Sequence, residues 1–378
     1  MPQASQSSFH PPLPPTTEED RFNRLRLLRS RRVGVSTYHR LMAEHGSAAA
    51  ALEALPQIAA AAGVRNYEIC PEGVIHAELK SARKAKARMI CIGEPEYPTD
   101  LADINDAPPF LWAIGNADLL QRPMIALIGA RNASSLGTRM ARKLATELAE
   151  AGYVVVSGLA RGIDAAVHSV TVDSGTIAVL GGGVDVIYPQ ENTDLFHAIG
   201  AKGLRLSEQP IGLQPQARHF PARNRIISGL CRATVVVEAA QKSGSLITAD
   251  TALAQGRDVM AVPGHPFDGR AGGCNALIRD GATLVRSADD ILQALEPITP
   301  QMPLDLPPQK PAPQKRSLRE TADLHTQILS QLGPSPIAED QVLRDLKLNP
   351  KQAGPAIVDL ELDGRIQRQP GGMISLMS

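Results

Sequence analysis

The sequence predicts an α/β fold with a doubly wound parallel sheet at its centre, a helical domain before it and a winged-helix domain after it. Three observations lead to this prediction. Between residues 123 and 296, apolar runs of strand length alternate with amphipathic segments of helical length. The residues before about 80 show helical patterns with short loops, and a proline-rich stretch separates a last block at the C-terminus. Strands that alternate with helices form parallel sheets with right-handed crossovers.

The strands of the predicted sheet are short apolar runs, which is typical of strands that are buried on both faces. Two amphipathic segments between them, Thr138–Glu150 and Ser245–Gln255, are predicted helices. The predicted strands cover residues 89–92, 124–129, 153–158, 176–182, 204–208, 234–239, 258–264 and 282–287.

The chain divides into five parts, because 378 residues are more than one hydrophobic core usually serves. Residues 1–17 are rich in Pro and Ser and are predicted to be a disordered tail. Residues 18–80 are predicted to form a helical domain and residues 81–296 the sheet domain. Residues 297–316 hold seven prolines and are expected to be a linker. Residues 317–378 show three helical patterns and then two short strands, which is the order of a winged helix.

The helical domain is basic, with seven arginines and no acidic residue within residues 21–43. Within it, the stretch RRVGVSTYHRLMAEHGS (31–47) resembles a helix–hairpin–helix, whose turn can offer backbone N–H groups to a phosphate backbone. An arginine-coated helix face in solvent is the alternative, and the sequence leaves both open. Further cations follow before the next strand, at Lys80, Arg83, Lys84, Lys86 and Arg88.

Composition limits the classes of function. Lys plus Arg and Asp plus Glu both number 39, so a polyanion would have to be recognised by local patches and not by a global field. The sequence has no apolar run long enough to span a membrane and no signal peptide. The four cysteines are scattered, which favours a reducing cytoplasm over disulfides or a metal site. The twelve aromatic residues are few for a mechanism built on base stacking.

Four loops of the sheet domain that directly follow predicted strands contain Gly or Ser turns, and two of these loops carry arginines. Because ligands bind at the carboxyl ends of the strands in open α/β sheets, these loops predict a site for a phosphate-bearing ligand. The loops are GARNASSLG (129–137), SGLARGIDAAVHS (157–169), GGGVDVIYPQEN (181–192) and AQKSGSLITAD (240–250). The candidate phosphate-binding residues in them are Gly129, Arg131, Ser134, Ser157, Gly158, Arg161, Gly162, Gly181, Gly182, Gln190, Asn192, Lys242, Ser243, Gly244 and Ser245.

The stretch HFPARNRIISGL (219–230) has helical spacing and one charge out of place. If the helix begins at Pro221, Arg223 falls in the middle of its apolar stripe, and Arg225 falls on the solvent face. Since a buried charge is costly without a partner, we expect Arg223 to reach past the core toward a phosphate, together with Asn224 and Arg225. Loss of Arg223 should then lower affinity more than stability. Buried pairing with Glu238 or Glu208 is the alternative.

The sequence predicts no catalytic residue, no metal site and no cofactor. The patterns HExxH, GxSxG and GxxxxGK[ST] do not occur, and GARNASSLG lacks the middle glycine of a dinucleotide-binding loop. His168 lies four residues after Asp164 on one predicted helix, but no nucleophile accompanies the pair at a recognisable spacing. A helix-surface pair or a packing contact is the simpler interpretation.

Six motifs, in order, closely resemble those of the DNA-processing protein A (DprA/Smf) family: GARNASSLG, VVVSGLARGIDAAVHS, TIAVLGGGVDVIYPQEN, HFPARNRIISGLC, VVVEAAQKSGSLITADTALAQGRDVMAVPG and GCNALIRDGA. The resemblance covers residues 95–296 and extends more loosely to both ends. It implies an extended Rossmann-like domain between a SAM-like helical domain and a winged helix. It also implies a cytoplasmic, homodimeric protein without enzymatic activity, which binds single-stranded DNA and loads the RecA recombinase during natural transformation.

The resemblance also assigns DNA contacts to particular positions of this sequence. They fall on Arg131, the Ser157/Gly158 and Arg161/Gly162 loop, the Gly181–Gly183 turn and the segment YPQEN. This chain has Gln190 where many relatives have Lys, and the loss of one cation should weaken affinity and its dependence on salt. Arg223, Arg225 or Lys242 is expected to compensate.

Two other classes of function stay open at this point. Phosphoribohydrolases have Rossmann-like sheets with a phosphate turn resembling SGSLITAD, although here Asp250 stands where they carry a catalytic Glu. A winged-helix regulator would read duplex DNA through residues 317–378. The acidic run Asp359, Glu361 and Asp363 at the end of the third predicted helix speaks against duplex binding and favours a protein-contacting or accessory role.

Overall fold

The computed structural model describes residues 14–296 and 318–377. The chain divides between Pro297 and Ile298 into two compact units, which are described separately below. The predicted tail up to residue 13 and the predicted linker at 297–316 lie outside the described residues.

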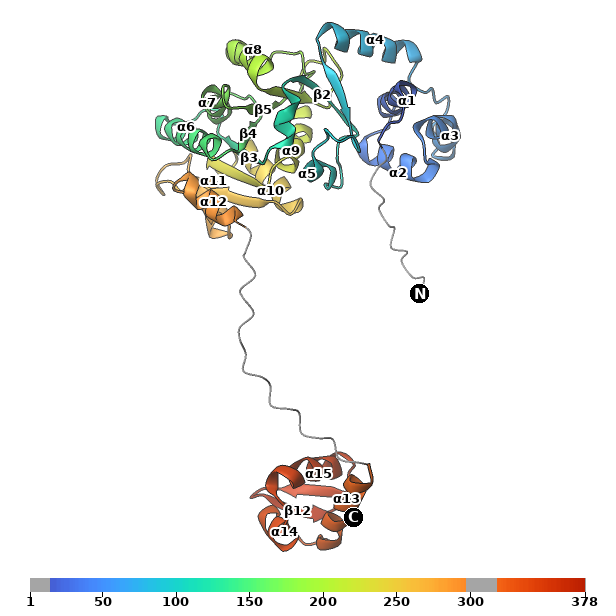
Figure 1. Cartoon of the computed structure of the whole chain (residues 1–378), viewed down its shortest axis with the longest axis vertical. Helices are drawn as coiled ribbons and strands as arrows, with labels where there is room; N and C mark the ends of the chain where they lie inside the picture. Colours follow the sequence, from blue (N-terminus) through green and yellow to red (C-terminus); the bar gives the residue numbers. More distant parts are fainter. Residues whose placement is uncertain (1–13, 297–317, 378) are drawn as a thin grey trace. The chain divides into compact units, whose positions relative to one another are not determined.

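A nine-stranded sheet forms the centre of the first unit (Figure 1). Its strand order is β1-β2-β6-β5-β4-β3-β7-β8-β9, and all pairings from β6 to β9 are parallel. This confirms the predicted doubly wound sheet. The strands are β1 Arg88–Cys91, β2 Phe110–Gly115, β3 Met124–Gly129, β4 Val154–Ser157, β5 Thr176–Val179, β6 Leu204–Ser207, β7 Ala233–Glu238, β8 Asp258–Ala261 and β9 Thr283–Leu284.

The sheet differs from the prediction at one edge, where β2 was not expected. β2 pairs antiparallel with β6, placing Trp112 opposite Ser207, and β1 pairs antiparallel with β2. Antiparallel neighbours need no crossover helix, so strand–helix alternation does not reveal them. The sheet is therefore mostly parallel, with an antiparallel extension toward the N-terminal helices.

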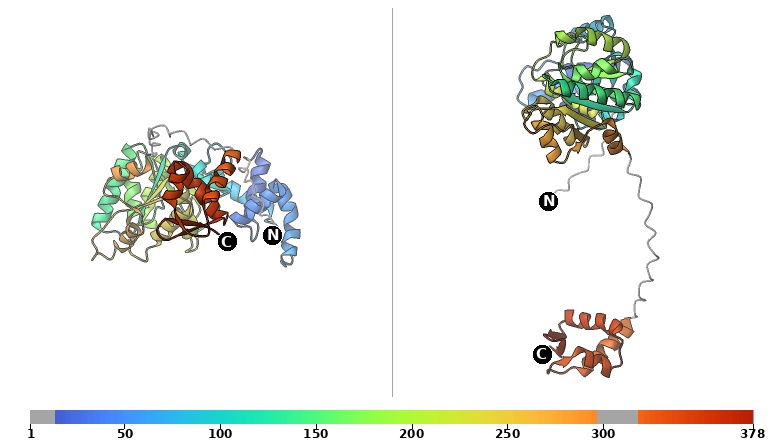
Figure 2. Two further views of the ribbon diagram at one scale, coloured as in Figure 1. Left: turned by 90° about the horizontal axis from the view of Figure 1, so that it is seen from below. Right: turned by 90° about the vertical axis from the view of Figure 1, so that its left-hand side faces the viewer.

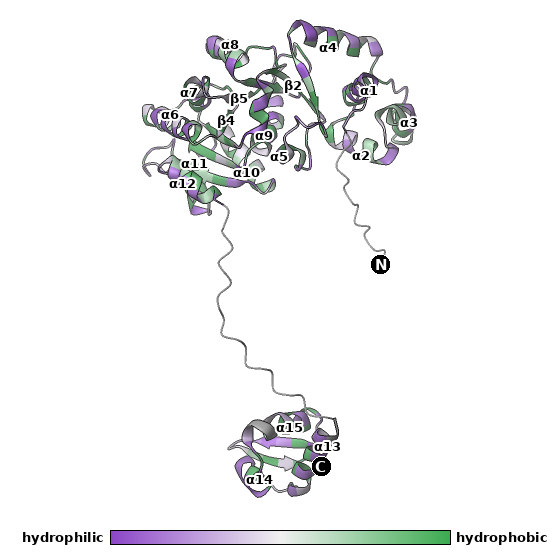
Figure 3. Cartoon of the chain, in the orientation of Figure 1, coloured by the Kyte–Doolittle hydropathy of each residue, from purple (hydrophilic) through white to green (hydrophobic). Residues whose placement is uncertain are grey.

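Helices cover both faces of the sheet (Figure 2). Apolar side chains of α6, α7 and α12 form the core on one face, and those of α9, α10 and α11 the core on the other. Figure 3 shows the hydrophobic strands lying between these layers. The helices are α5 Thr99–Ala102, α6 Ser135–Glu150, α7 Ile163–Thr171, α8 Thr193–Lys202, α9 His219–Gly229, α10 Gly244–Ala254, α11 Gly272–Arg279 and α12 Ala288–Leu295.

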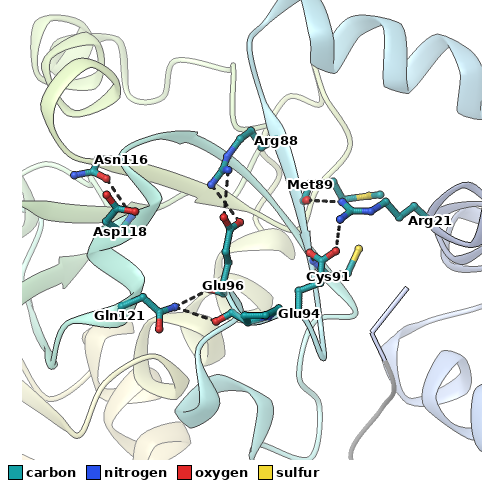
Figure 4. A network of polar contacts seen from close by, with 10 residues as sticks. Arg21, Arg88, Met89, Cys91, Glu94, Glu96, Asn116, Asp118 and Gln121 are labelled. Atoms are coloured by element: carbon teal, nitrogen blue, oxygen red, sulfur yellow. Dashed lines mark hydrogen bonds and ion pairs between the residues drawn. The ribbon is translucent and has the colours of Figure 1, made fainter. Parts of the chain in front are cut away.

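Four helices precede the sheet: α1 Glu18–Arg29, α2 Val35–His45, α3 Ala48–Ala61 and α4 Glu72–Lys84. The hairpin between α1 and α2 confirms the predicted turn, and α2 ends at Gly46, whose φ of 73° suits glycine. Polar contacts join these helices to the edge of the sheet. Arg21 of α1 donates to the carbonyl oxygen of Met89 at 3.2 Å and pairs with Glu94, whose carboxylate accepts from the backbone N–H of Cys91 (Figure 4).

The second unit has its own hydrophobic core and the predicted winged-helix order. Its elements are α13 Leu318–Gln331, β10 Ile337–Ala338, α14 Glu339–Asp345, α15 Pro350–Leu362, β11 Ile366–Gln369 and β12 Met373–Leu376. The second of the three helical patterns predicted in this block starts at Ile337, whereas α14 begins two residues later, because Ile337 and Ala338 pair with β12 as a short strand. None of the helices at 14–296 and 318–377 combines the length and apolar character needed to cross a membrane.

Candidate nucleic-acid interface

The four loops singled out in the sequence meet at the carboxyl edge of the parallel sheet. The order of the strands reverses beside β3, since β4, β5 and β6 follow on one side and β7, β8 and β9 on the other. In open α/β sheets the crevice at such a reversal is the usual place for a ligand. Here the loops after β3 and β7 border the crevice, and those after β4 and β5 continue it.

Two adjoining hollows form one groove along this edge. The smaller measures about 290 Å³ and the larger about 920 Å³. Four large side chains border both hollows, namely Arg131, Tyr188, Phe220 and Arg223. Because the hollows share these walls, the groove is continuous from the loop after β5 to the loop after β7.

Most of the predicted phosphate-binding residues line this groove. Arg131 and Arg223 border both hollows. The smaller hollow also has Gly158, Arg161, Gly181, Gly182 and Gln190. The larger hollow also has Gly129, Asn224, Lys242, Ser243, Gly244 and Ser245.

Four other predicted residues of the loops lie outside the lining and hold the loops in place. The hydroxyl of Ser157 is fully buried and donates to the carbonyl oxygen of Leu127 at 2.7 Å, so it is not available to a ligand. Asn192 donates from Nδ2 to the carbonyl oxygen of Leu159 at 2.9 Å. These contacts explain why polar residue types occur at both positions without a role in the lining.

Ser134 and Gly162 shape the two loops that meet at the reversal. Ser134 caps α6 by accepting from the N–H of Gly137 at 2.9 Å, while its own N–H donates to Glu238 at 2.9 Å. Gly162 has a φ of 77°, and a Cβ there would lie 2.2 Å from the carbonyl oxygen of Ala130. Only glycine lets the loop after β4 approach the loop after β3 this closely.

Arg225 does not lie on a solvent face, and the expectation for it was wrong. It is only 8% exposed and is held between Glu208 and Asp106, with 3.4 Å from Nε to Asp106. The segment around α5 covers this side of α9, which a helical wheel of α9 alone cannot reveal. Arg225 is therefore held in ion pairs and does not border either hollow, which does not support the expectation that it compensates for the uncharged Gln190.

Arg223 is buried, and it contacts neither of the carboxylates considered from the sequence. Its Nη1 donates to the carbonyl oxygens of Gly158 at 2.7 Å and Val179 at 2.5 Å. Its Nε donates to Oδ1 of Asn224 at 3.1 Å. Glu238 and Glu208, the expected partners, are occupied by Ser134 and Arg225. Since α9 begins at His219 and not at Pro221, Arg223 lies in its second turn, below the groove.

The contact between Arg223 and Gly158 requires glycine. A Cβ at position 158 would lie 2.0 Å from Nη1 of Arg223. Asp164 holds the same loop from the other side, because its Oδ2 accepts from the backbone N–H groups of Gly158 at 3.1 Å and Ala160 at 3.3 Å. Burial lowers the pKa of Arg223 to about 10, and the Asp164 carboxylate acts in the opposite direction. Arg223 therefore stays charged at neutral pH and forms the floor of the groove.

His168 and Asp164 have separate structural roles. Thr176 donates its hydroxyl proton to the carbonyl oxygen of Val155 at 2.9 Å, so it must accept from Nδ1–H of His168 at 2.8 Å. Nε2 of His168 is buried without a hydrogen-bond partner, and burial lowers the pKa of the ring to about 3. The neutral imidazole is a packing group, as the simpler interpretation of the sequence held. Burial likewise raises the pKa of Asp164, against the influence of Arg223.

Arg131 is the most accessible charged group at the junction of the hollows. Its side chain is exposed, and its guanidinium carbon lies 5.2 Å from the ring centroid of Phe220. The ring of Tyr188 lies 5.5 Å from that of Phe220, at an interplanar angle of 37°. No carboxylate among residues 14–296 or 318–377 forms an ion pair with Arg131. The junction therefore offers an uncompensated cation beside two flat aromatic faces.

The groove as a whole is electropositive. Arg131, Lys242 and the buried Arg223 border it without an ion pair among the described residues, whereas Arg161 faces Glu191 at 3.4 Å. Arg270 also borders the larger hollow, where its Nε pairs with Asp268 at 3.2 Å, and the sequence reasoning missed it. Its position in the loop after β8, at the same edge of the sheet, is a signal that could have revealed it.

The described residues hold no group of three or more His, Cys, Asp or Glu side chains placed to bind a metal ion. Asp250, the acid required by a phosphoribohydrolase, lies exposed on α10 and borders neither hollow. The arrangement combines cations, backbone N–H groups and aromatic faces in an open groove. Chemically, this set suits an extended anion that also carries flat rings.

Comparison with known proteins assigns the family. Residues 88–296 match the family model of DNA recombination-mediator protein A, residues 18–81 that of the DprA-like N-terminal HHH domain and residues 311–372 that of the DprA winged helix domain. The sequence is 50% identical over 202 residues to DNA processing protein DprA of Streptococcus pneumoniae, an alignment that covers 53% of this chain and 71% of the relative.

Two solved structures are similar to this one. The X-ray structure of DNA processing protein A from Streptococcus pneumoniae is similar with a TM-score of 0.57 and 40% identity, over 68% of this chain and 86% of that one. A structure of DNA processing protein A from Helicobacter pylori, which concerns its single-stranded DNA binding mode, is similar with a TM-score of 0.51 and 28% identity, over 56% and 97%. From its motifs, its fold and these matches, the chain belongs to the DNA recombination-mediator protein A (DprA/Smf) family.

Proposed function

We propose that this chain binds single-stranded DNA in the groove at the carboxyl edge of its sheet. The observation that carries the proposal is the free guanidinium of Arg131, 5.2 Å from the ring centroid of Phe220, at the point where the two hollows meet. A cation beside an aromatic face fits a phosphate next to an unstacked base, and duplex DNA does not present its bases in that way. The similar protein from Helicobacter pylori, which binds single-stranded DNA, supports this choice of ligand.

The phosphate backbone supplies most of the affinity in this proposal. Arg131, Arg161, Lys242 and Arg270 are exposed around the groove, and Ser243 opens α10 at its border. Such contacts do not read sequence, so selectivity among bases should be low and dependence on salt high. Gln190, exposed in the smaller hollow, adds no charge there.

The finer parts of the proposal come from the family. We propose a cytoplasmic homodimer that protects incoming single strands during natural transformation and loads the RecA recombinase onto them. The winged helix then contacts protein or plays an accessory part. Asp359 and Glu361 on α15 and Asp363 just after it are exposed and support this role, because duplex readout requires cations at that helix.

A titration of labelled oligo-dT and of a duplex at several salt concentrations tests ligand class and binding mode together. We expect the single strand to bind more tightly, with log affinity falling by about 0.7 per contacted phosphate for each unit of log salt. The Arg131→Glu variant should lose binding in a gel shift while its melting temperature changes by only a few degrees, because Arg131 is exposed. The matched control is Arg142→Glu, an exposed arginine of α6 outside the groove lining. Full affinity in the Arg131 variant would remove Arg131 from the site.

The proposal assigns this chain a binding role and no catalytic role. The phosphoribohydrolase alternative predicts release of free base from nucleoside monophosphates. Since Asp250 borders neither hollow, we expect no release above background. Turnover by the purified chain would overturn this part of the proposal.

A further inference from the structure

The arginines of the N-terminal helices are mostly used inside the protein. Five of the seven cations noted in the sequence between residues 21 and 43 form ion pairs. Arg29, for example, pairs with the buried Glu78 at 2.9 Å, and Arg26 pairs with Glu72 at 2.8 Å. The exceptions are Arg31 and Arg32, which are exposed at the hairpin. Most of these charges are therefore neutralised, although the sequence there looks strongly basic.

The second half of α4 has the opposite character. Lys80, Arg83 and Lys84 are all exposed, and Lys86 is exposed just after the helix. Among residues 14–296, none of these four side chains forms an ion pair or a hydrogen bond with another residue. No acidic residue occurs between Glu78 and Glu94. These four residues are called the α4 patch.

The spacing within the α4 patch places the charges on one surface. Residues 80, 83 and 84 are related by three and four positions, so their side chains are neighbours on the helix. Residues 80 and 84 are separated by about 6 Å along the helix axis. Cations in the last turn also complement the helix dipole, but that effect is worth little at an exposed site and reaches only about one turn. The dipole effect explains the cations Arg83 and Lys84 in the last turn of α4, but it does not explain the cations Lys80 and Lys86.

The α4 patch belongs to a helix that packs behind the wall of the groove. Ile75 and Ala82 of α4 share a core with Val184 and Ile211, which come from the loops after β5 and β6. The same loop after β5 supplies Gly181, Gly182 and Val186 to the smaller hollow. The helix therefore supports the groove with one face and exposes the α4 patch on another.

We propose that the α4 patch is a second phosphate-backbone contact, used by single strands that extend beyond the groove. This proposal rests on the proposed function, because its ligand is the single-stranded DNA that the groove is proposed to bind. Four cations without an ion pair among the described residues form a strong local source of positive charge on a chain whose net charge is zero. Backbone binding needs only such charge and no base pocket.

The test compares short and long strands on the full chain. The variant Lys80→Gln/Arg83→Gln/Lys84→Gln keeps much of the length of the side chains and removes three charges. Its affinity for oligo-dT of about six nucleotides, which fits one groove, should equal that of the unmodified chain. Its affinity for oligo-dT of about thirty nucleotides should fall on the order of tenfold at low salt, and the slope of log affinity against log salt should decrease by about 2. Unfolding by urea should be unchanged, since the three side chains are exposed.

The matched control is Arg139→Gln/Arg142→Gln/Lys143→Gln on α6, which removes three exposed cations at the same helical spacing. There Lys143 has a carboxylate neighbour, Glu147 at 3.7 Å. An equal loss of long-strand affinity in this control would overturn the proposal, because the effect would then be one of overall charge. An α4 variant whose slope of log affinity against log salt for long strands is unchanged would also overturn the proposal. This includes the case in which the variant instead loses binding to polyglutamate, an acidic polypeptide. Failure of the groove itself gives a different result, since Arg131→Glu would then leave short-strand binding intact.

Discussion

Replacing Arg223 by Ala tests whether the floor of the groove is held by this one side chain. The substitution removes the donors to the buried carbonyl oxygens of Gly158 and Val179, at 2.7 and 2.5 Å. It also removes the positive charge that acts on the buried carboxylate of Asp164. Each unsatisfied buried acceptor costs about 1–3 kcal/mol, and the uncompensated carboxylate adds to this. We therefore expect the free energy of unfolding to fall by about 3–5 kcal/mol.

This expectation revises the one drawn from the sequence, in which the loss of Arg223 lowered affinity more than stability. Affinity should fall as well, because Arg223 holds the loop that carries Arg161 into the smaller hollow. The fall is indirect, however, and follows from disorder of the loop. Arg223→Lys is the informative companion, since it keeps the charge but cannot donate in the same planar geometry. We expect the stability and the affinity of the Arg223→Lys variant to lie between those of the Arg223→Ala variant and those of the unmodified chain.

The assay uses the single tryptophan of the chain. Trp112 is buried in β2 of the same compact unit, so its fluorescence reports urea unfolding there. Anisotropy of labelled oligo-dT, measured where both variants are fully folded, gives the affinity. A loss of less than about 1 kcal/mol in the unfolding free energy of Arg223→Ala, together with a tenfold or greater loss of affinity, would refute this reasoning. It would mean that Arg223 contacts phosphate directly.

Three further predictions concern other residues. Burial lowers the pKa of His168 from 6.5 to about 3, so between these values the unfolded chain binds a proton that the folded chain does not, and stability falls as the pH falls. At about pH 5 the free energy of unfolding, measured with urea, should be about 2 kcal/mol lower than at neutral pH. A His168→Gln variant whose unfolding free energy falls by the same amount would contradict this prediction. Gly158→Ala should lower both stability and oligo-dT affinity, because its Cβ would lie 2.0 Å from Nη1 of Arg223; Gly269→Ala, which meets nothing within 4 Å, should change neither. A fragment of residues 317–378 should show no preference for duplex over single strands in a gel shift, and tight site-specific duplex binding would point instead to a winged-helix regulator.

Local patterns in the sequence predicted the central fold well. The parallel strands are short and apolar because both of their faces are covered by helices, and that burial leaves a signal in each strand separately. The N-terminal hairpin was also readable, since a helix end such as Gly46 acts within one turn. β2 was not predicted, because its partner β6 is remote in the sequence and no crossover helix marks the pairing.

The residues of the candidate site also divide into those that the sequence predicted and those whose contacts it did not predict. Glycines and arginines that directly follow strands were found, because strand direction alone brings the carboxyl ends to one edge. The partners of buried charges were not found, since they depend on which segments pack together. Arg225 was expected in solvent and instead pairs with Glu208. Arg223 donates to two carbonyl oxygens, and no carboxylate of residues 14–296 or 318–377 forms an ion pair with it.

The sequence by itself predicted a phosphate-bearing ligand, since the four loops after the strands and their basic residues are local features of the chain. Only the tertiary structure decided which of these cations remain free to meet that ligand. Within the part of the chain that the structure describes, Arg131 and the α4 patch form no ion pair, whereas Arg29 and Arg225 are neutralised by Glu78 and Glu208 in other segments of the chain. The physical reason is that the effect of a charge depends on its neighbours in space, and these neighbours are set by packing.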